Sequence, residues 1–183
     1  MNALDIRSVD MQGRVQRTSH QTTNDAAWTT LADHLEAIYY TNTAGPTSAV
    51  TYLYRVIAGV TTNNTDSTSP ASDFDYATIA SALFTDEPLV AGGTTIKGVH
   101  VGELRQAIDA VRLAANLPPA WSSHAPATGT VLASSFTDMR QRLDEARNQL
   151  FGRGHQLGYS PPAPASGGRI NAFQLQEMRE GVR

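Results

Sequence analysis

His100 and Glu103, in the second half of the chain, have side chains that could bind a metal ion. They lie three positions apart, so on a helix both would project from one face. Imidazole nitrogen and carboxylate oxygen are common zinc ligands, but a zinc site usually takes three or four protein ligands. The chain has five histidines and no His-Glu-x-x-His or paired-histidine spacing. We therefore expect His100 to cap or pack at a helix start, with zinc binding as the alternative.

His34 and Glu36 form a second weak metal candidate. Their His-x-Glu spacing occurs in zinc deaminases, which also need a cysteine-containing partner motif. The chain has no cysteine, which excludes that partner motif, a thiolate zinc site, an iron–sulfur cluster and a disulfide framework. This pair therefore predicts a metal site only together with ligands from elsewhere in the chain.

Motifs for nucleophilic catalysis and phosphate binding are absent from the sequence. It contains neither a Gly-x-Ser-x-Gly elbow nor a Gly-x-x-x-x-Gly-Lys loop. Asp66, Asp73 and Asp75 lack the spacing of a calcium loop, so we interpret them as solvated turn acids. The sequence favours a chain with no catalytic residue and no cofactor. The alternative is a small metal-dependent hydrolase that uses histidine and carboxylate ligands on zinc.

Three arginines end three similar ten-residue segments, which begin at Ile96, Val131 and Ile170. Each segment starts with a branched apolar residue and closes with an acid, a Leu or Met, and an arginine: Arg105, Arg140 and Arg179. An aromatic residue precedes each segment: Phe84, Trp121 and Tyr159. Self-similarity at this period is typical of repeat architectures. We expect three helical units, 84–120, 121–158 and 159–183, with the aromatic and branched apolar residues buried.

The recurring arginines could contact an anion or a glycan, or they could pair with an acid and pack across the next unit. Recurrence is what any repeat shows, so the second interpretation is favoured. The acids Glu103, Asp138 and Glu177 are expected in the first helical turn, where Ser135 and Asp138 would form a capping box. Apolar residues mark one face of each long helix at helical spacing: Leu104, Ile108, Val111 and Ala115, then Met139, Leu143, Ala146 and Leu150.

The first half of the chain has strand-like patterns. Segment 51–58 alternates with a two-residue period, as do 14–17 and, less cleanly, 37–40. Turn-rich stretches separate these runs, the longest at 61–70. The pattern predicts an α+β chain: an incomplete antiparallel β-sandwich over residues 1–80, followed by a helical repeat domain over 81–183.

The segment Thr51-Tyr52-Leu53-Tyr54-Arg55-Val56-Ile57-Ala58 resembles the penultimate strand of a fibronectin type III domain. The resemblance implies that Tyr52 is the corner tyrosine of that fold. Only about a dozen residues precede Val15, too few for two full strands, so the domain looks N-terminally truncated. An incomplete sandwich exposes a strand edge, so we expect a homodimer joined along that edge or by exchange of residues 1–12. The alternative is a monomer in which segment 4–9 supplies the strand.

Segments 84–89 and 96–105 resemble a C-terminal helical repeat of large exported bacterial proteins. That repeat has the pattern aromatic-Thr-Asp-Asp/Glu-Pro-Leu, then Gly-x-x-Ile-Lys-Ala-x-His, then Glu-Leu-Arg. The later copies are looser, with Ser135 and Gln174 at the histidine position. The resemblance implies a secreted or cell-surface location as part of a larger protein, although no signal peptide opens this chain.

Composition excludes several classes of protein. The 183 residues carry a net charge of −3, divided into −6 for residues 1–92 and +3 for residues 93–183, so no nucleic-acid footprint is expected. No apolar run approaches the ~20 residues that span a bilayer. The sequence therefore favours a non-catalytic structural or interaction module that binds a protein or a glycan.

Overall fold

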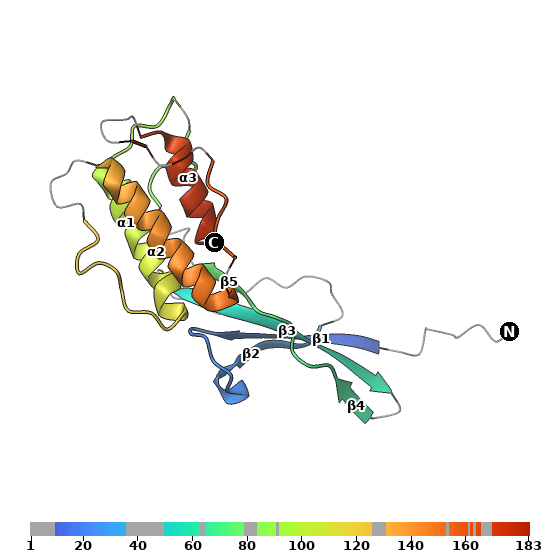
Figure 1. Cartoon of the computed structure of the whole chain (residues 1–183). Helices are drawn as coiled ribbons and strands as arrows, with labels where there is room; N and C mark the ends of the chain where they lie inside the picture. Colours follow the sequence, from blue (N-terminus) through green and yellow to red (C-terminus); the bar gives the residue numbers. More distant parts are fainter. Residues whose placement is uncertain are drawn as a thin grey trace. The chain divides into compact units, whose positions relative to one another are not determined.

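The computed structural model divides the chain into two compact units. One comprises Met1–Pro46 and Tyr52–Tyr76, here the sheet unit; the other comprises Thr47–Thr51 and Ala77–Arg183, here the helical unit (Figure 1). The structure describes residues 10–35, 50–62, 65–78, 84–90, 92–125, 131–152, 154–160, 162, 164–165 and 170–183. Each unit is described by itself.

The sheet unit is built on an antiparallel sheet of five strands, of which Thr51 and residues 77–78 are counted with the helical unit. They are β1 (Asp10–Thr18), β2 (Thr29–Leu35), β3 (Thr51–Thr62), β4 (Thr65–Thr68) and β5 (Asp75–Thr78). The strand order is β2-β1-β3-β4, and β5 also pairs with β3. A short 3₁₀ helix, η2 (Asp25–Ala27), connects β1 to β2. The long, twisted β3 is therefore the central strand of the sheet.

The alternation in segment 51–58 places Leu53 in the buried interior, where it is fully covered. On the same strand, the Arg55 guanidinium lies 4.3 Å from the ring centroid of the buried Trp28 and 2.8 Å from Asp25. Tyr52 is half-buried beneath Arg17, whose Cζ lies 4.5 Å from its ring centroid. Cation–π contacts of this kind attach the connection around η2 to the sheet.

Two predicted strands are confirmed, because segments 14–17 and 51–58 lie in β1 and β3. The prediction of a turn throughout 61–70 is wrong: β4 lies there and pairs back on Gly59–Thr62 as a hairpin. Segments 1–9 and 37–40 lie outside the described residues. The described strands form one sheet, so the two-sheet sandwich and its likeness to fibronectin type III stay predictions.

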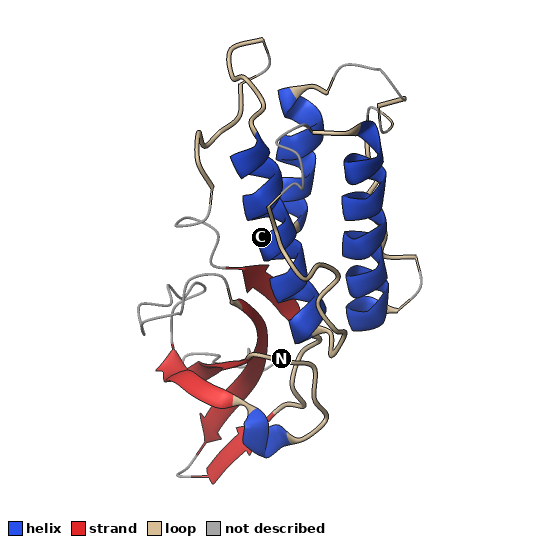
Figure 2. Cartoon of the chain, turned by 90° about the vertical axis from the view of Figure 1, so that its left-hand side faces the viewer, coloured by secondary structure: helices blue, strands red, loops and turns tan. Residues whose placement is uncertain are grey.

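The helical unit contains α1 (Gly98–Ala114), α2 (Ala133–Phe151) and α3 (Ala172–Gly181). Figure 2 shows the three helices side by side. Each repeat contributes one fully buried residue to each of three core layers: Val101, Phe136 and Leu175; Leu104, Met139 and Met178; Ile108, Leu143 and Val182. The predicted apolar faces are therefore confirmed. Among the described residues, no helix is both long enough and apolar enough to cross a bilayer.

The helices begin earlier than the sequence predicted. Lys97, Leu132 and Asn171 are the N-cap residues, so Glu103 falls in the second turn of α1, and no first turn contains an acid. The predicted capping box of Ser135 and Asp138 is therefore wrong. The backbone N–H groups at Lys97 and Asn171 are instead bound by side chains three residues later, His100 Nδ1 at 3.2 Å and Gln174 Oε1 at 3.2 Å.

The branched apolar residues that open the repeats are only partly buried, in contrast to the prediction. Ile96, Val131 and Ile170 together line a cavity of about 590 Å³ at the helix N-termini. Since all three start residues meet at one cavity, α1, α2 and α3 run parallel. Of the three aromatic residues, Phe84 is buried and the other two are half-buried.

Candidate functional site

The three repeated arginines lie against the three repeated aromatic rings. The distance from guanidinium Cζ to ring centroid is 5.4 Å for Arg105 and Trp121, 4.4 Å for Arg140 and Tyr159, and 4.5 Å for Arg179 and Phe84. Each arginine contacts the aromatic ring of the following repeat, and the last contacts that of the first. The three pairs therefore form a closed ring, called here the arginine ring.

Acidic residues extend the arginine ring in the same direction. Arg179 Nη2 lies 3.3 Å from Glu103, and Arg140 Nη2 lies 3.5 Å from Glu177. Arg179 also bonds to Glu87 at 3.1 Å and to the backbone carbonyl of Thr85 at 3.1 Å. Each of these arginines thus joins its own repeat to a neighbouring repeat.

The same acids hold the segment that follows the aromatic residue of their own repeat. Glu103 accepts hydrogen bonds from the backbone N–H of Thr85, at 2.9 Å, and from its hydroxyl. Glu177 accepts one from the N–H of Ser160 at 2.8 Å. The second repeat differs, since Asp138 accepts from the indole Nε1 of Trp121 at 3.0 Å. The acids therefore fix the position of each aromatic residue, so that its ring lies against the arginine of the preceding repeat, or for Phe84 that of the last.

Burial shapes the electrostatics at the point where the arginine ring closes. Arg179 is fully buried, and this burial lowers its pKa against the opposing charges of Glu87 and Glu103. Burial alone would raise the pKa of Glu87, but hydrogen bonds from Arg183 and Gln176 and the charge of Arg179 bring it below its usual value. Arg179 and Glu87 therefore form an ionised pair inside the unit.

His100, the first metal candidate, is fully buried and both of its ring nitrogens are engaged. Nδ1 accepts from the N–H of Lys97 at 3.2 Å, so Nε2 carries the proton and donates to Asp86 at 3.1 Å. Lys97 Nζ also lies 3.0 Å from Asp86, and its hydrogen bond, followed by that of His100, lowers the pKa of Asp86. His100 thus caps α1, as expected, and Glu103 points to other partners.

Of the remaining metal candidates, the His34 side chain and Glu36 lie outside the described residues. Asp66 lies in β4, Asp73 is exposed, and Asp75 accepts from the N–H of Tyr76 at 2.8 Å. In the part of the chain that the structure describes, no three His, Cys, Asp or Glu side chains are grouped closely enough to hold a metal ion.

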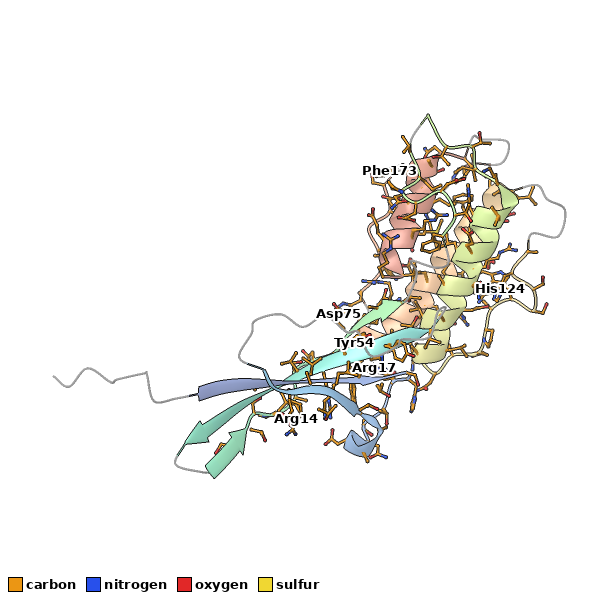
Figure 3. The ribbon with its side chains drawn as sticks, turned by 180° about the vertical axis from the view of Figure 1, so that it is seen from behind. Arg14, Arg17, Tyr54, Asp75, His124 and Phe173 are labelled. Atoms are coloured by element: carbon orange, nitrogen blue, oxygen red, sulfur yellow. The ribbon has the colours of Figure 1, made fainter. Side chains whose placement is uncertain are left out.

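The sequence reasoning missed a second set of recurring contacts, which hold the loops after α1 and α2. Asp109, buried in α1, accepts from Ala120 N–H at 2.6 Å and bonds to His124 Nε2 at 2.9 Å. Figure 3 shows His124 beside α1. Asp144, at the equivalent position in α2, accepts from Leu157 N–H at 3.1 Å. The recurrence of an acid four residues after Arg105 and Arg140 was the available signal.

The arrangement is suited to holding the three repeats together. In the arginine ring, Arg140 and Arg179 bond to acids, and Arg179 also bonds to a backbone carbonyl of the helical unit. Each of the three aromatic rings lies under a guanidinium group. Comparison of the chain with protein-family models, curated proteins and solved structures finds no match to any of them.

Proposed function

We propose that this chain is a non-catalytic structural or interaction module whose helical unit is a rigid scaffold. The observation that carries the proposal is the closure of the arginine ring, in which Arg179 of the last repeat lies on Phe84 and bonds to Glu103 of the first. Glu103, which a zinc site at His100 would have used, is thereby committed to a bond between repeats.

Buried charged pairs of this kind contribute little net stability compared with apolar residues, yet they fix which groups must lie together. Arg140 bonds to one acid and one ring of the third repeat, and Arg179 bonds to two acids and one ring of the first, so they favour a single register of the three units. A scaffold with one register presents its solvent-facing side chains in constant geometry. Constant geometry of the solvent-facing side chains is suited to a surface that binds a protein or a glycan.

The proposed location is the surface of a bacterial cell or the secreted fraction, as part of a larger protein. It rests on the likeness of segments 84–89 and 96–105 to repeats of exported bacterial proteins. The first repeat matches that pattern best, and it also closes the arginine ring, because Thr85, Glu87 and Glu103 are the partners of Arg179.

The competing hypothesis is a zinc-dependent hydrolase, and metal content together with turnover separates the two. Elemental analysis of the purified chain should find far less than one zinc per chain. A panel of ester, peptide, phosphate and glycoside substrates should be hydrolysed no faster than in buffer, with or without added zinc. His100→Gln should change neither result. One tightly bound zinc per chain, or turnover that His100→Gln abolishes, would establish the hydrolase and end the proposal.

A further inference from the structure

A polar groove lies along the solvent-facing side of α2, between this helix and segment 156–159. Its volume of about 780 Å³ is within the roughly 300–1,000 Å³ of small-molecule binding sites. Four of its lining residues carry side-chain amides: Gln141, Asn148, Gln149 and Gln156. Within the described residues, none of these four amides has a hydrogen-bond partner in the protein. This α2 groove therefore offers an unusual density of uncommitted donors and acceptors.

Asn148 is the most informative of the four. Its Oδ1 is buried from solvent and accepts no hydrogen bond. An acceptor left in this state costs about 1–3 kcal/mol relative to a satisfied one, so such atoms are rare in folded proteins. If the Asn148 side chain rotates so that Oδ1 faces the α2 groove, a ligand that donates a hydrogen bond to it would remove this cost. The free protein thus has an unsatisfied acceptor at Asn148, which a bound ligand would satisfy.

Comparison with the first repeat shows that the scaffold does not require this amide. The residue of α1 equivalent to Asn148 is Leu113, which is 55% exposed. The usual relation is inverted, since the apolar side chain faces solvent and the polar one is partly buried. Gln149 likewise corresponds to Ala114, whereas Gln141 corresponds to another glutamine, Gln106. The first repeat therefore has no amide at the positions equivalent to 148 and 149.

Charge in the α2 groove disfavours an anionic ligand. Of the three charged residues lining it, Asp144 and Glu145 are acids, and Arg140 is committed to Glu177 and the Tyr159 ring. A hydrogen bond from Arg112 lowers the pKa of Glu145 despite its partial burial, so this carboxylate stays ionised near neutral pH. Glu145 is paired with Arg112 and Arg142, and Asp144 Oδ1 accepts from Leu157 N–H and the Tyr159 hydroxyl. A neutral ligand with many hydroxyl groups avoids repulsion and can donate to the remaining lone pairs of both carboxylates.

Amide groups suit such a ligand because each carries two donors and a carbonyl acceptor, and each hydroxyl is both donor and acceptor. The half-buried ring of Tyr159 adds apolar surface to the lining, and its hydroxyl is held by Asp144 at 3.2 Å. Sugars combine a dense set of hydroxyls with apolar C–H faces. The chemistry of the lining therefore matches a carbohydrate more closely than a peptide, which has fewer hydroxyls.

We propose that the α2 groove binds a neutral carbohydrate, with Asn148 and Gln149 as principal hydrogen-bonding residues. The proposal rests on the proposed function as an interaction module and specifies the class of partner. On binding, the Asn148 side chain rotates so that Oδ1 accepts from a sugar hydroxyl, while the amides of Gln149 and Gln141 reach neighbouring hydroxyls. Asp144 and Glu145 supply further acceptors.

The test is an NMR titration of the full chain, labelled with ¹⁵N, using cellobiose, maltose and diacetylchitobiose as probes. At least one sugar should produce saturable shifts at residues 141–149 and 156–159. Asn148→Leu, which installs the residue of the first repeat, should weaken that binding about tenfold or more. It should leave the free energy of unfolding unchanged or higher, because an unsatisfied buried acceptor is removed. A merely structural Asn148 would instead lose stability.

Two further variants complete the test. Gln149→Ala, at an exposed position, should also weaken binding without affecting folding, and it decides the matter if Asn148→Leu folds poorly. Gln106→Ala changes an exposed glutamine at the equivalent of Gln141, away from the α2 groove, and should bind as the parent does.

Several results would overturn the proposal. They are the absence of saturable shifts with every sugar, binding that survives both Asn148→Leu and Gln149→Ala, tighter binding of sialyllactose than of neutral sugars, and a response to a neutral tripeptide but to no sugar. These leave the non-catalytic module intact. Hydrolysis of a bound sugar, seen as new anomeric signals in the same spectra, would instead refute the proposed function.

Discussion

The guanidinium of Arg179 lies 4.5 Å from the ring centroid of Phe84, so the last helix of the helical unit is fastened to its first segment. The helix α3 has only ten residues, which is too short for a helix to be stable by itself in water. The stability that its length does not supply therefore comes from its fully buried residues Leu175 and Met178, from the buried C-cap residue Val182 and from the Arg179 contacts.

Replacing Arg179 by methionine should lower the free energy of unfolding by about 3–5 kcal/mol, because Glu87 and Glu103 lose a buried partner. Urea denaturation followed by circular dichroism measures this change. The control is Arg142→Met, which removes half-exposed pairs with Asp138 and Glu145 and should cost about 0–1 kcal/mol. Equal effects of the two substitutions would contradict a structural role for the arginine ring.

Truncation of Leu104 or Leu143 to alanine should cost about 2–5 kcal/mol each, since both side chains are fully buried in the shared core. Leu113→Ala removes the same atoms from an exposed position and should change stability by no more than about 0.5 kcal/mol. Thermal and urea unfolding of the three variants provide the comparison. A core variant as stable as Leu113→Ala would be inconsistent with the repeat packing.

His100→Gln should preserve the cap of α1, because Gln174 makes the equivalent bond to the N–H of Asn171 in α3. His100→Ala should cost about 1 kcal/mol or more from the lost cap, in addition to the cavity left in the core. The measured quantity is the difference in free energy of unfolding between the two variants. If glutamine were as destabilising as alanine, the importance of the cap would be refuted.

Acid should weaken the helical unit through Asp86. Hydrogen bonds from Lys97 and His100 lower the pKa of Asp86 below the ordinary value of about 3.9, so the ionised form stabilises the folded state. This contribution is fully present above about pH 4 and is lost as the pH falls through the lowered pKa. Asp86→Asn removes it, and asparagine tolerates the positive φ of 55° at this position. Unfolding measured at several pH values should show that the stability difference between parent and variant shrinks below about pH 4; a constant difference would argue against this linkage.

Self-association through the sheet unit is a further expectation. Among the described strands, β2 pairs only with β1 and β4 only with β3, so each has an outer edge where another strand could add. Light scattering at micromolar concentration should give the mass of two chains. The mass of a single chain would exclude the dimer.

Local sequence patterns were sufficient to identify the helices and two of the strands. The 3.6-residue period predicted a buried helix face with Leu104, Ile108 and Val111, and the structure buries all three side chains. The two-residue period around Leu53 predicted the strand but not which of its faces is buried; the structure buries Leu53 and exposes Val56. The repeat of arginine and aromatic residue was also visible. Strand β4 was missed because its Thr- and Ser-rich sequence is equally typical of turns, and because the sequence did not indicate the strand with which it pairs.

The pairing of the recurring residues depended on neighbours in space. The sequence shows Phe84 ahead of Arg105, yet Arg105 lies on Trp121 of the next repeat and Phe84 receives Arg179 from the last. The helices also begin earlier than predicted, because His100 and Gln174 provide their caps. The spacing of the acids did not indicate these caps. A guanidinium can bond to any acid or ring within its reach. Its partner is therefore chosen by the packing of three parallel helices, which brings distant repeats into contact and buries the charges that must then be satisfied.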